Sequence, residues 1–275
     1  MKKQEIFESI TDSILSEIEN GNLAWRRPWA QGLPANYISK QVYQGINFLL
    51  LCLDNVSQPF YLTFLQAKEK QLHIKKGAKG RQIIFYKMLS NFRQNNKGEL
   101  EDDSFPMLRL SYVFNLDDVE GYEIPAPTLS APVELLNNII SNHKPVIEYN
   151  TIHCYYSEDR NLISTPAVNS FTSEGEYFSS LFHELVHWTG HKSRLKRQLT
   201  HNIKYHDFSF EELIAEIGST YLCGLCGIEN TLNNSAAYLK GWLEIGKMDK
   251  SFIPKAAIQA QKAVNYLINK TEDAA

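Results

Sequence analysis

Apolar residues at the start of the chain recur at the spacing of a helix face. This spacing predicts a helix over residues 4–20, whose buried side would consist of Ile6, Phe7, Ile10, Ile14, Leu15 and Ile18. Gly21 follows directly and is a natural stop, because glycine readily adopts the left-handed conformation that ends many helices. Further along, Thr63 and Gln66 match a capping box, which predicts a short helix over residues 63–72.

Two stretches rich in β-branched and aromatic residues predict strands in the first half of the chain. They are RQIIFYK, residues 81–87, and LRLSYVFNL, residues 108–116. The polar segment 89–105 between them predicts a mobile hairpin tip. Prolines in YEIPAPTLSA, residues 122–131, then interrupt regular structure.

Beyond this break the pattern changes to amphipathic helices with short strands among them. The predicted helices are 131–142, 173–190, 209–226, 234–246 and 253–270, and the predicted strands are 145–149, 152–156 and 161–164. We therefore expect an α+β fold with two domains. Residues 1–125 would form an α+β domain, and residues 126–275 a mainly helical domain with a small β-sheet.

The composition agrees with a folded protein of this size. Hydrophobic residues make up 43% of the 275 residues and charged residues 21%, which is enough apolar material for two cores. No apolar run reaches the roughly 20 residues needed to span a bilayer, and the N-terminus lacks the apolar segment of a signal peptide. Four cysteines in a chain of this length are not typical of a disulfide framework. We therefore expect a cytoplasmic protein with no membrane partner.

The strongest chemical signal is the pattern His-Glu-x-x-His in residues 183–187. Because residues four apart lie on one helix face, His183 and His187 can present their imidazoles to one metal ion. Glu184 lies beside them and can act as general base toward a water molecule. The caps expected for this helix are Thr172 or Ser173 at its start and Gly190 at its end. The alternative is an ordinary amphipathic helix with two satisfied histidines.

A third protein ligand is expected from the next helix. The metzincin pattern would need histidine at position 193, where this chain has Ser193, so that class is excluded. Glu212 and Glu216 lie four residues apart, so one can bind the metal while the other accepts a hydrogen bond from a ligand histidine. We choose Glu212 as the ligand and Glu216 as the hydrogen-bonding acid, and the reverse assignment is the main rival. A capping box formed with Ser209 is the other explanation of Glu212.

Three protein ligands leave one position open, which distinguishes a catalytic zinc ion from a structural one. Zinc (Zn2+) would lower the pKa of a bound water to about 7, so that Glu184 could take its proton at neutral pH. Such a site most often hydrolyses a peptide bond. Cys223 and Cys226 are expected to pack near a helix end, because a four-cysteine zinc knot needs a second close pair and Cys52 and Cys154 are isolated.

A local excess of positive charge marks the first half of the chain. Residues 60–90 carry seven lysines and arginines against one acid, a net charge of +6, whereas the whole chain has a net charge of −3. The residues expected to contact a nucleic acid are Lys75, Lys76, Lys79 and Arg81 of the turn KKGAKGR, and Trp25, Arg26, Arg27 and Trp29. Basic surfaces with exposed rings suit single-stranded DNA, because bases stack on rings while cations follow the phosphates. The alternative is a solvated charged turn with tryptophans buried in a core.

Longer stretches of the chain resemble the ArdC-type antirestriction proteins of plasmids and phages. In the first half they are AWRRPWAQGLPANYISKQVYQGIN, YLTFLQAKEKQLHIKKGAKGRQIIFYK and YVFNLDDVEG. In the second half they are YFSSLFHELVHWTGHKSRLKR, FEELIAEIGSTYLCGLCGI and the AQKAVNYLI end. The resemblance implies an N-terminal single-stranded-DNA-binding domain and a C-terminal zincin-like metallopeptidase domain. It also implies a metal held by His183, His187 and an acid of residues 211–216, and a role in shielding incoming DNA from host restriction.

Three functions are consistent with these features. The first is an antirestriction protein that binds single-stranded DNA and carries a zinc peptidase site, whose substrate would be a host restriction protein or another protein. The second is a DNA-binding protein whose metal domain is a non-catalytic scaffold. The third is a regulatory metalloprotease that docks on protein through its first half. Glu184 favours a catalytic site, because a scaffold needs ligands but no general base.

Overall fold

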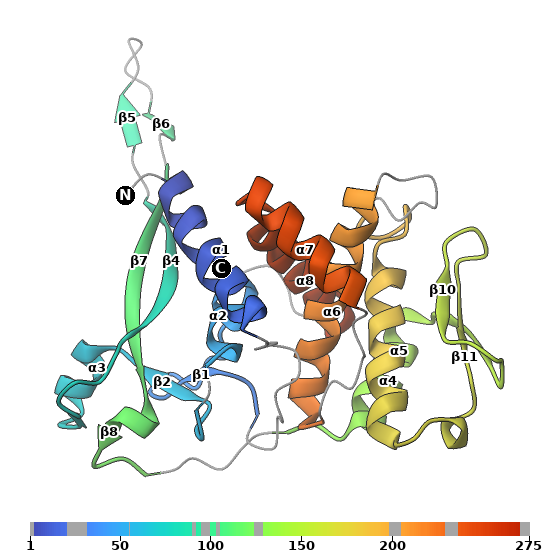
Figure 1. Cartoon of the computed structure of the whole chain (residues 1–275), viewed down its shortest axis with the longest axis horizontal. Helices are drawn as coiled ribbons and strands as arrows, with labels where there is room; N and C mark the ends of the chain where they lie inside the picture. The colour runs from blue at the N-terminus through green and yellow to red at the C-terminus, as the bar shows by residue number, and fades with distance from the viewer. Residues whose placement is uncertain are drawn as a thin grey trace.

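Two ends that contain β-sheet flank a central group of helices (Figure 1). The computed structural model describes residues 3–20, 32–54, 56–89, 92–94, 100–102, 105–123, 129–197, 205–228 and 236–269. The first half of the chain forms one end, and the second half forms the other end and contributes helices α6, α7 and α8 to the centre. The protein therefore has the α+β architecture that the sequence predicts.

The first half of the chain is built around a four-stranded sheet. Its elements are α1 (Lys3–Glu19), β1 (Ala35–Asn36), α2 (Gly45–Cys52), β2 (Phe60–Leu62), α3 (Phe64–Glu69), β3 (His73–Ile74), β4 (Arg81–Leu89), β5 (Phe92–Gln94), β6 (Leu100–Asp102), β7 (Phe105–Asn115), the 3-10 turn η2 (Leu116–Asp118) and β8 (Val119–Glu120). The sheet has the order β1-β2-β7-β4, with β1 parallel to β2 and β7 antiparallel to both β2 and β4. The short pairs β3–β8 and β5–β6 lie outside this sheet. The centre of the predicted hairpin tip, residues 95–99, lies outside the described ranges.

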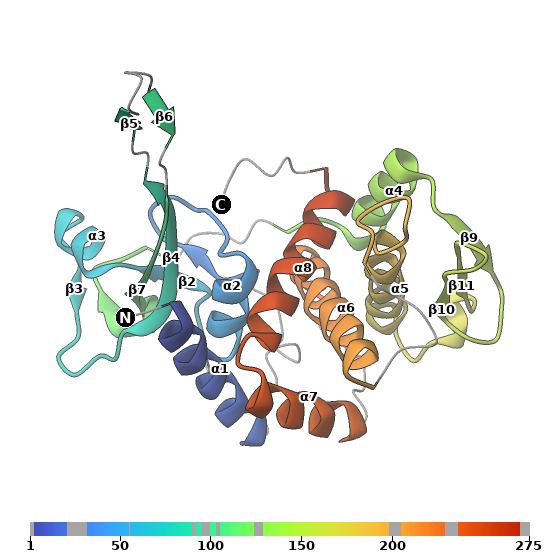
Figure 2. The same cartoon turned by 90° about the horizontal axis from the view of Figure 1, so that it is seen from above.

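The second half packs helices against a three-stranded sheet. Its elements are α4 (Pro132–His143), β9 (Val146–Tyr149), β10 (Tyr155–Ser157), β11 (Leu162–Thr165), the 3-10 turn η3 (Val168–Ser170), α5 (Glu174–Thr189), α6 (Tyr205–Cys226), α7 (Ala236–Met248) and α8 (Phe252–Leu267). The sheet has the order β10-β11-β9, with β11 parallel to β9 and antiparallel to β10. Helix α5 lies between this sheet and α6 (Figure 2).

Two predicted helix starts are confirmed at the level of single hydrogen bonds. The hydroxyl of Thr63 accepts from the backbone N–H of Gln66 at 3.2 Å, and the Gln66 side chain accepts from the N–H of Thr63 at 2.9 Å. The hydroxyl of Ser173 accepts from the N–H of Glu176 at 3.1 Å, so Ser173 caps α5. Gly190 is the residue at which α5 ends. Ser173 and Gly190 therefore mark the two ends of α5, the helix that carries the His-Glu-x-x-His pattern.

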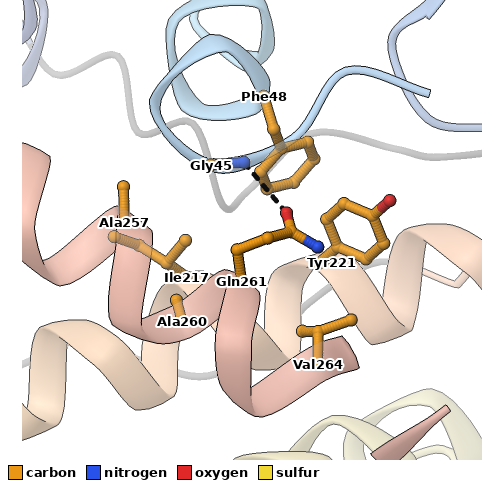
Figure 3. Close-up of a pocket in the computed structure, with 8 residues that line it drawn as sticks. All are labelled: Gly45, Phe48, Ile217, Tyr221, Ala257, Ala260, Gln261 and Val264. Carbon is orange, nitrogen blue, oxygen red and sulfur yellow. Dashed lines mark hydrogen bonds between the residues drawn. The ribbon is translucent and has the colours of Figure 1, made fainter. Parts of the chain in front are cut away.

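One hydrophobic core runs through both halves of the chain. Ile6, Ile10 and Ile14 of α1 and Phe48 of α2 belong to the same buried cluster as apolar residues of α5, α6 and α8. Figure 3 shows one point of this junction, where the Gln261 side chain accepts from the backbone N–H of Gly45 at 2.9 Å. Beside this bond the Phe48 and Tyr221 rings meet edge to face, with centroids 4.9 Å apart. The first half of the chain is therefore packed directly on the helices of the second.

The structure also differs from the predicted elements. The short strands β1, β2, β3 and β8 are not predicted, and the strand predicted over 152–156 is β10, Tyr155–Ser157. Two helices differ as well. Helix α2 is not predicted, because its eight residues GINFLLLC are nearly all apolar and no polar face marks a helical period. Helix α6 begins at Tyr205, four residues before the predicted start. Ser209 therefore lies inside α6, and the explanation of Glu212 as part of a capping box is wrong. None of the helices in the described ranges is long and apolar enough to cross a membrane.

Candidate metal centre

His183 and His187 lie one helical turn apart on α5 and turn their rings toward α6. Their Nε2 atoms are 3.0 Å apart. Glu212 of α6 faces both rings: one carboxylate oxygen lies 3.5 Å from Nε2 of His183 and the other 3.5 Å from Nε2 of His187. Within the described residues, these three side chains form the group of candidate ligands whose donor atoms all lie within 4.8 Å of one another.

The spacing of these donor atoms fits a small divalent cation. Ligand atoms bound tetrahedrally at about 2.0–2.1 Å from a zinc ion lie about 3.3 Å from one another. The Nε2 atoms of the two histidines are 3.0 Å apart, and each lies 3.5 Å from one of the two carboxylate oxygens of Glu212, so these separations are close to this value. The side chains of His183, His187 and Glu212 expose only 10%, 13% and 17% of their surface, so little water competes for their donor atoms. Two imidazoles and one carboxylate form a donor set that suits zinc and similar ions.

The electrostatics of the centre favour positive charge. Burial disfavours the charged form of His183, but Glu212, Glu216 and Glu184 outweigh this effect and raise its pKa to about 9. Burial also disfavours the ionised form of Glu212, yet hydrogen bonding to His183 and the charge of His187 lower its pKa. A proton on His183 therefore compensates part of the negative charge of the surrounding carboxylates. A metal cation would supply the same compensation.

Glu211 and Arg197 hold His187 from behind, and neither was predicted as a site residue. Nδ1 of His187 lies 3.2 Å from Oε1 of Glu211. Arg197 donates to both oxygens of Glu211, from Nε at 2.9 Å and from Nη2 at 2.8 Å. Arg197 also donates to the hydroxyl of Thr189 and to the carbonyl of Val186, both on α5. With its Nδ1 proton fixed by Glu211, the ring of His187 can direct the Nε2 lone pair to a cation bound between the three candidate ligands.

Glu216 lies behind His183, on the face of α6 that also carries Glu212. Its Oε1 atom is 3.7 Å from Nδ1 of His183. Glu212 is instead close to Nε2 of both histidines. The structure thus brings His183, His187, Glu212 and Glu216 together, with Glu212 as one of the three residues of the donor group and Glu216 outside that group.

Glu184 lies beside the centre and is held by the β-sheet. Its Oε2 atom accepts a hydrogen bond from the backbone N–H of Tyr156, on β10, at 2.8 Å. The hydroxyl of Tyr156 and the side chain of Asn161 are in turn bonded by Arg194, at 3.3 and 2.6 Å. The guanidinium of Arg194 stacks on the Trp188 ring at 3.7 Å. Arg194 therefore fixes the β10–β11 hairpin against α5, and the hairpin fixes Glu184.

The cysteines contribute no ligand to this group. Cys223 and Cys226 are buried near the end of α6 and are free thiols, as the packing interpretation predicts. Cys154 precedes β10, and burial together with the charge of Glu184 raises its pKa to about 12. Its side chain is therefore a neutral thiol at physiological pH, which is a poor metal ligand.

Four of the residues predicted to contact DNA are described by the structure, and they lie at the opposite side of the molecule from this centre (Figure 1). Lys75, Lys76 and Lys79 are exposed on the turn between β3 and β4. Arg81 is paired with Asp54, with Nε 2.7 Å from a carboxylate oxygen, so part of the predicted positive charge is compensated. The other four, Trp25, Arg26, Arg27 and Trp29, lie outside the residues that the structure describes.

Comparison with protein families identifies the class of each half. A model described as zincin-like metallopeptidase matches residues 134–259, which include every residue of the candidate centre. A model of the N-terminal domain of the anti-restriction factor ArdC matches residues 4–114. A zincin-like half thus follows an ArdC-type half in one chain.

Solved structures and other proteins extend the comparison to the whole chain. The metal-free crystal structure of the antirestriction protein ArdC from plasmid R388 is 33% identical, covers 96% of this chain and 97% of that one, and gives a TM-score of 0.79. Its Mn(II)-bound form covers 98% and 99%, with a TM-score of 0.78. The chain belongs to the ArdC family of antirestriction proteins.

Two further relatives differ in how much of their own length matches this chain. The DNA primase TraC of Escherichia coli is 27% identical over 97% of this chain, but the match covers only 27% of that protein. An uncharacterized protein of Sinorhizobium fredii, y4eC, is 26% identical over 98% of this chain and 94% of its own length. The chain therefore spans only about a quarter of the TraC protein, and the primase activity of TraC is not assigned to it.

Proposed function

We propose that this antirestriction family member binds single-stranded DNA through residues 1–125 and hydrolyses a peptide bond at a zinc centre in residues 126–275. The observation that carries the catalytic part is the convergence of His183, His187 and Glu212 within 4.8 Å, with Glu184 beside them. The DNA-binding part rests on the exposed lysines of the turn at 75–79 and on the family. We further propose that the protein acts in the cytoplasm of a cell that carries the plasmid or phage.

His183, His187 and Glu212 would hold the ion, and three ligands leave a fourth position for a substrate or water. When bound, zinc supplies Lewis-acid activation of a water molecule and of the substrate carbonyl. The Mn(II)-bound form of the R388 protein supports a divalent cation. Zinc is our choice because two imidazoles with one carboxylate form a typical catalytic zinc ligand set.

Glu184 would remove a proton from the attacking water. Its Oε2 atom accepts from the N–H of Tyr156 at 2.8 Å, which fixes the carboxylate and leaves Oε1 for the proton. Glu211 and Arg197 would keep His187 in the tautomer that binds metal. Each residue would then have one role. The two histidines and Glu212 would bind the ion, and Glu184 would accept the proton. Glu211 and Arg197 would orient His187.

The DNA-binding surface and the metal centre would bind different molecules. Helix α3, beside the basic turn, and helix α5, which carries the histidines, lie on opposite sides of the central helix α8 in both views (Figures 1 and 2). DNA on the basic turn is therefore remote from Glu184. This separation favours a protein substrate, such as a host restriction protein, over cleavage of the bound strand.

A mobility-shift experiment with the full-length protein tests the DNA-binding part of the proposal. Labelled single-stranded and double-stranded DNA of one sequence are compared at equal salt, with and without a chelator. We expect a preference for the single strand that the chelator does not change, because the basic turn lies outside the metal centre. A preference for duplex, or loss of DNA binding with the chelator, would contradict it.

A further inference from the structure

The turn between β3 and β4 presents lysines on a bare stretch of backbone. The backbone N–H of Ala78 donates to the carbonyl of Lys75 at 3.1 Å, and Gly77 has a φ of +89°. A Cβ added at Gly77 would meet no atom within 4 Å, so the backbone there is open to a ligand. Lys75, Lys76 and Lys79 are exposed around it. Glycine is needed for this conformation, because L side chains rarely adopt positive φ.

An exposed aromatic ring lies directly beside this turn. Tyr112 of β7 exposes 56% of its surface, although the strand is central in its sheet. A Cβ added at Gly80 would lie 3.1 Å from Cβ and 3.5 Å from Cδ1 of Tyr112. The ring thus packs on the backbone of Gly80, next to Lys79 in the chain. Glycine at position 80 leaves the room that this ring occupies.

The register of the sheet separates Tyr112 from the apolar core. Tyr112 is opposite Gln82, and two residues along the same face Leu110 is opposite Ile84. Ile84 and Leu110 pack into the main core, whereas Tyr112 lies beyond it. The exposed ring is therefore not explained by packing. Its neighbours in the turn are lysines, since Arg81 is directed to Asp54.

We propose that Tyr112 is a stacking platform for one base of a single strand, whose phosphates contact Lys76 and Lys79. An exposed ring beside exposed cations fits single-stranded nucleic acid, because every base has a face that can stack while the charges bind the backbone. Lys75 takes a smaller part, because its Nζ atom already donates to the carbonyl of Asp117 at 2.7 Å. This assignment rests on the proposed DNA-binding function and names the contact that the sequence patterns miss.

Fluorescence anisotropy of a labelled oligothymidylate of about 15 nucleotides, with the full-length protein, tests the assignment. Tyr112→Ala should weaken binding about 5- to 150-fold, with an unchanged salt slope, since stacking involves no counterion release. Tyr112→Phe keeps the ring and should bind like the parent. Thermal unfolding checks that each variant remains folded. Equal affinities of the parent and Tyr112→Ala would overturn the assignment.

A second pair of variants separates stacking from a general effect on the sheet. Gly80→Ala adds a methyl group 3.1 Å from Cβ and 3.5 Å from Cδ1 of Tyr112, so it should displace the ring and weaken binding in the parent. It should weaken binding less in the Tyr112→Ala background, because the displaced ring is then absent and only the contacts with Cβ of residue 112 and with Phe114 remain. Phe85→Ala is the matched control. Phe85 is an exposed ring of the neighbouring strand on the opposite face of the sheet, opposite Arg109.

The outcomes distinguish this inference from the proposed function. Loss of binding in Phe85→Ala but not in Tyr112→Ala would show that the DNA binds the other face of the sheet, and would overturn the assignment. Additive effects of Gly80→Ala and Tyr112→Ala would also contradict it. If the parent protein itself does not bind the oligonucleotide, the proposed DNA-binding function fails, and the assignment fails with it.

Discussion

Arg197 and Glu211 form a bidentate ion pair on the Nδ1 side of the His187 ring. The two hydrogen bonds are 2.9 and 2.8 Å long, and the side chains expose only 6% and 8% of their surface. Burial opposes the ionised form of Glu211, but its bonds to His187 and Arg197 lower its pKa. The carboxylate thus stays charged in a buried place and can hold the Nδ1 proton of His187.

This relationship predicts that Glu211→Gln weakens metal binding without removing a ligand. Outer hydrogen-bond partners of ligand histidines typically contribute about 10- to 100-fold in metal affinity. We expect an affinity loss of that size, measured by competition with a chromophoric chelator. Arg197→Met should lower the free energy of unfolding by about 3–5 kcal/mol, because it leaves the buried Glu211 carboxylate uncompensated. Unchanged affinity in Glu211→Gln would show that this acid does not orient His187.

The three proposed ligands make a separate prediction. Purified protein should carry about one zinc ion per chain, and His183→Ala should carry almost none, as measured by metal analysis after dialysis. Glu212→Gln should lose more affinity than Glu216→Gln, because Glu212 faces Nε2 of both histidines and Glu216 lies behind one of them. The opposite order would make Glu216 the ligand. Full occupancy in His183→Ala would contradict the centre itself.

Glu184→Gln tests the chemistry while keeping the site intact. The amide oxygen of glutamine can still accept from the N–H of Tyr156, so the fold and the metal content should match the parent. Hydrolysis of a protein substrate should fall by at least about 100-fold, the usual contribution of a general base. Cleavage at the parent rate would exclude this role. Protection of DNA from restriction by the same variant would show that antirestriction does not need proteolysis.

The parts of this site that depend on local geometry could be predicted from sequence. His183, Glu184 and His187 fall together because helical spacing fixes them, and the cap at Ser173 follows from the same local rules. The role of Glu211 could not be predicted in this way. It depends on Arg197, which follows α5 and folds back on it, with its N–H donating to the carbonyl of Gly190 at 2.8 Å. Long-range contacts of this kind leave no period in the sequence.

The same limit applies to the fold. Helices α1 and α5 have one apolar face and are predicted close to their observed bounds, whereas α2 is apolar on nearly all sides and gives no period. The division into residues 1–125 and 126–275 stays a prediction. The shared core of α1, α2, α6 and α8 means that a fragment ending near residue 125 would expose apolar surface, so DNA binding is better tested in the whole chain.

The lysines of the turn make the last prediction, which concerns salt. Replacing Lys75, Lys76 and Lys79 together by alanine should weaken binding to single-stranded DNA and reduce the slope of log affinity against log salt by up to about 2. Each lysine that pairs with a phosphate releases about 0.7 counterions from a single strand. The matched control changes three exposed lysines of the second half, Lys192, Lys255 and Lys262, and should keep the parent slope.

Arg81→Gln gives a further comparison within the same turn. Because Asp54 already compensates this arginine, its loss should lower thermal stability and change the slope little. A slope that stays at the parent value in the triple variant would show that phosphates do not contact this turn. The DNA would then have to bind elsewhere on the first half of the chain.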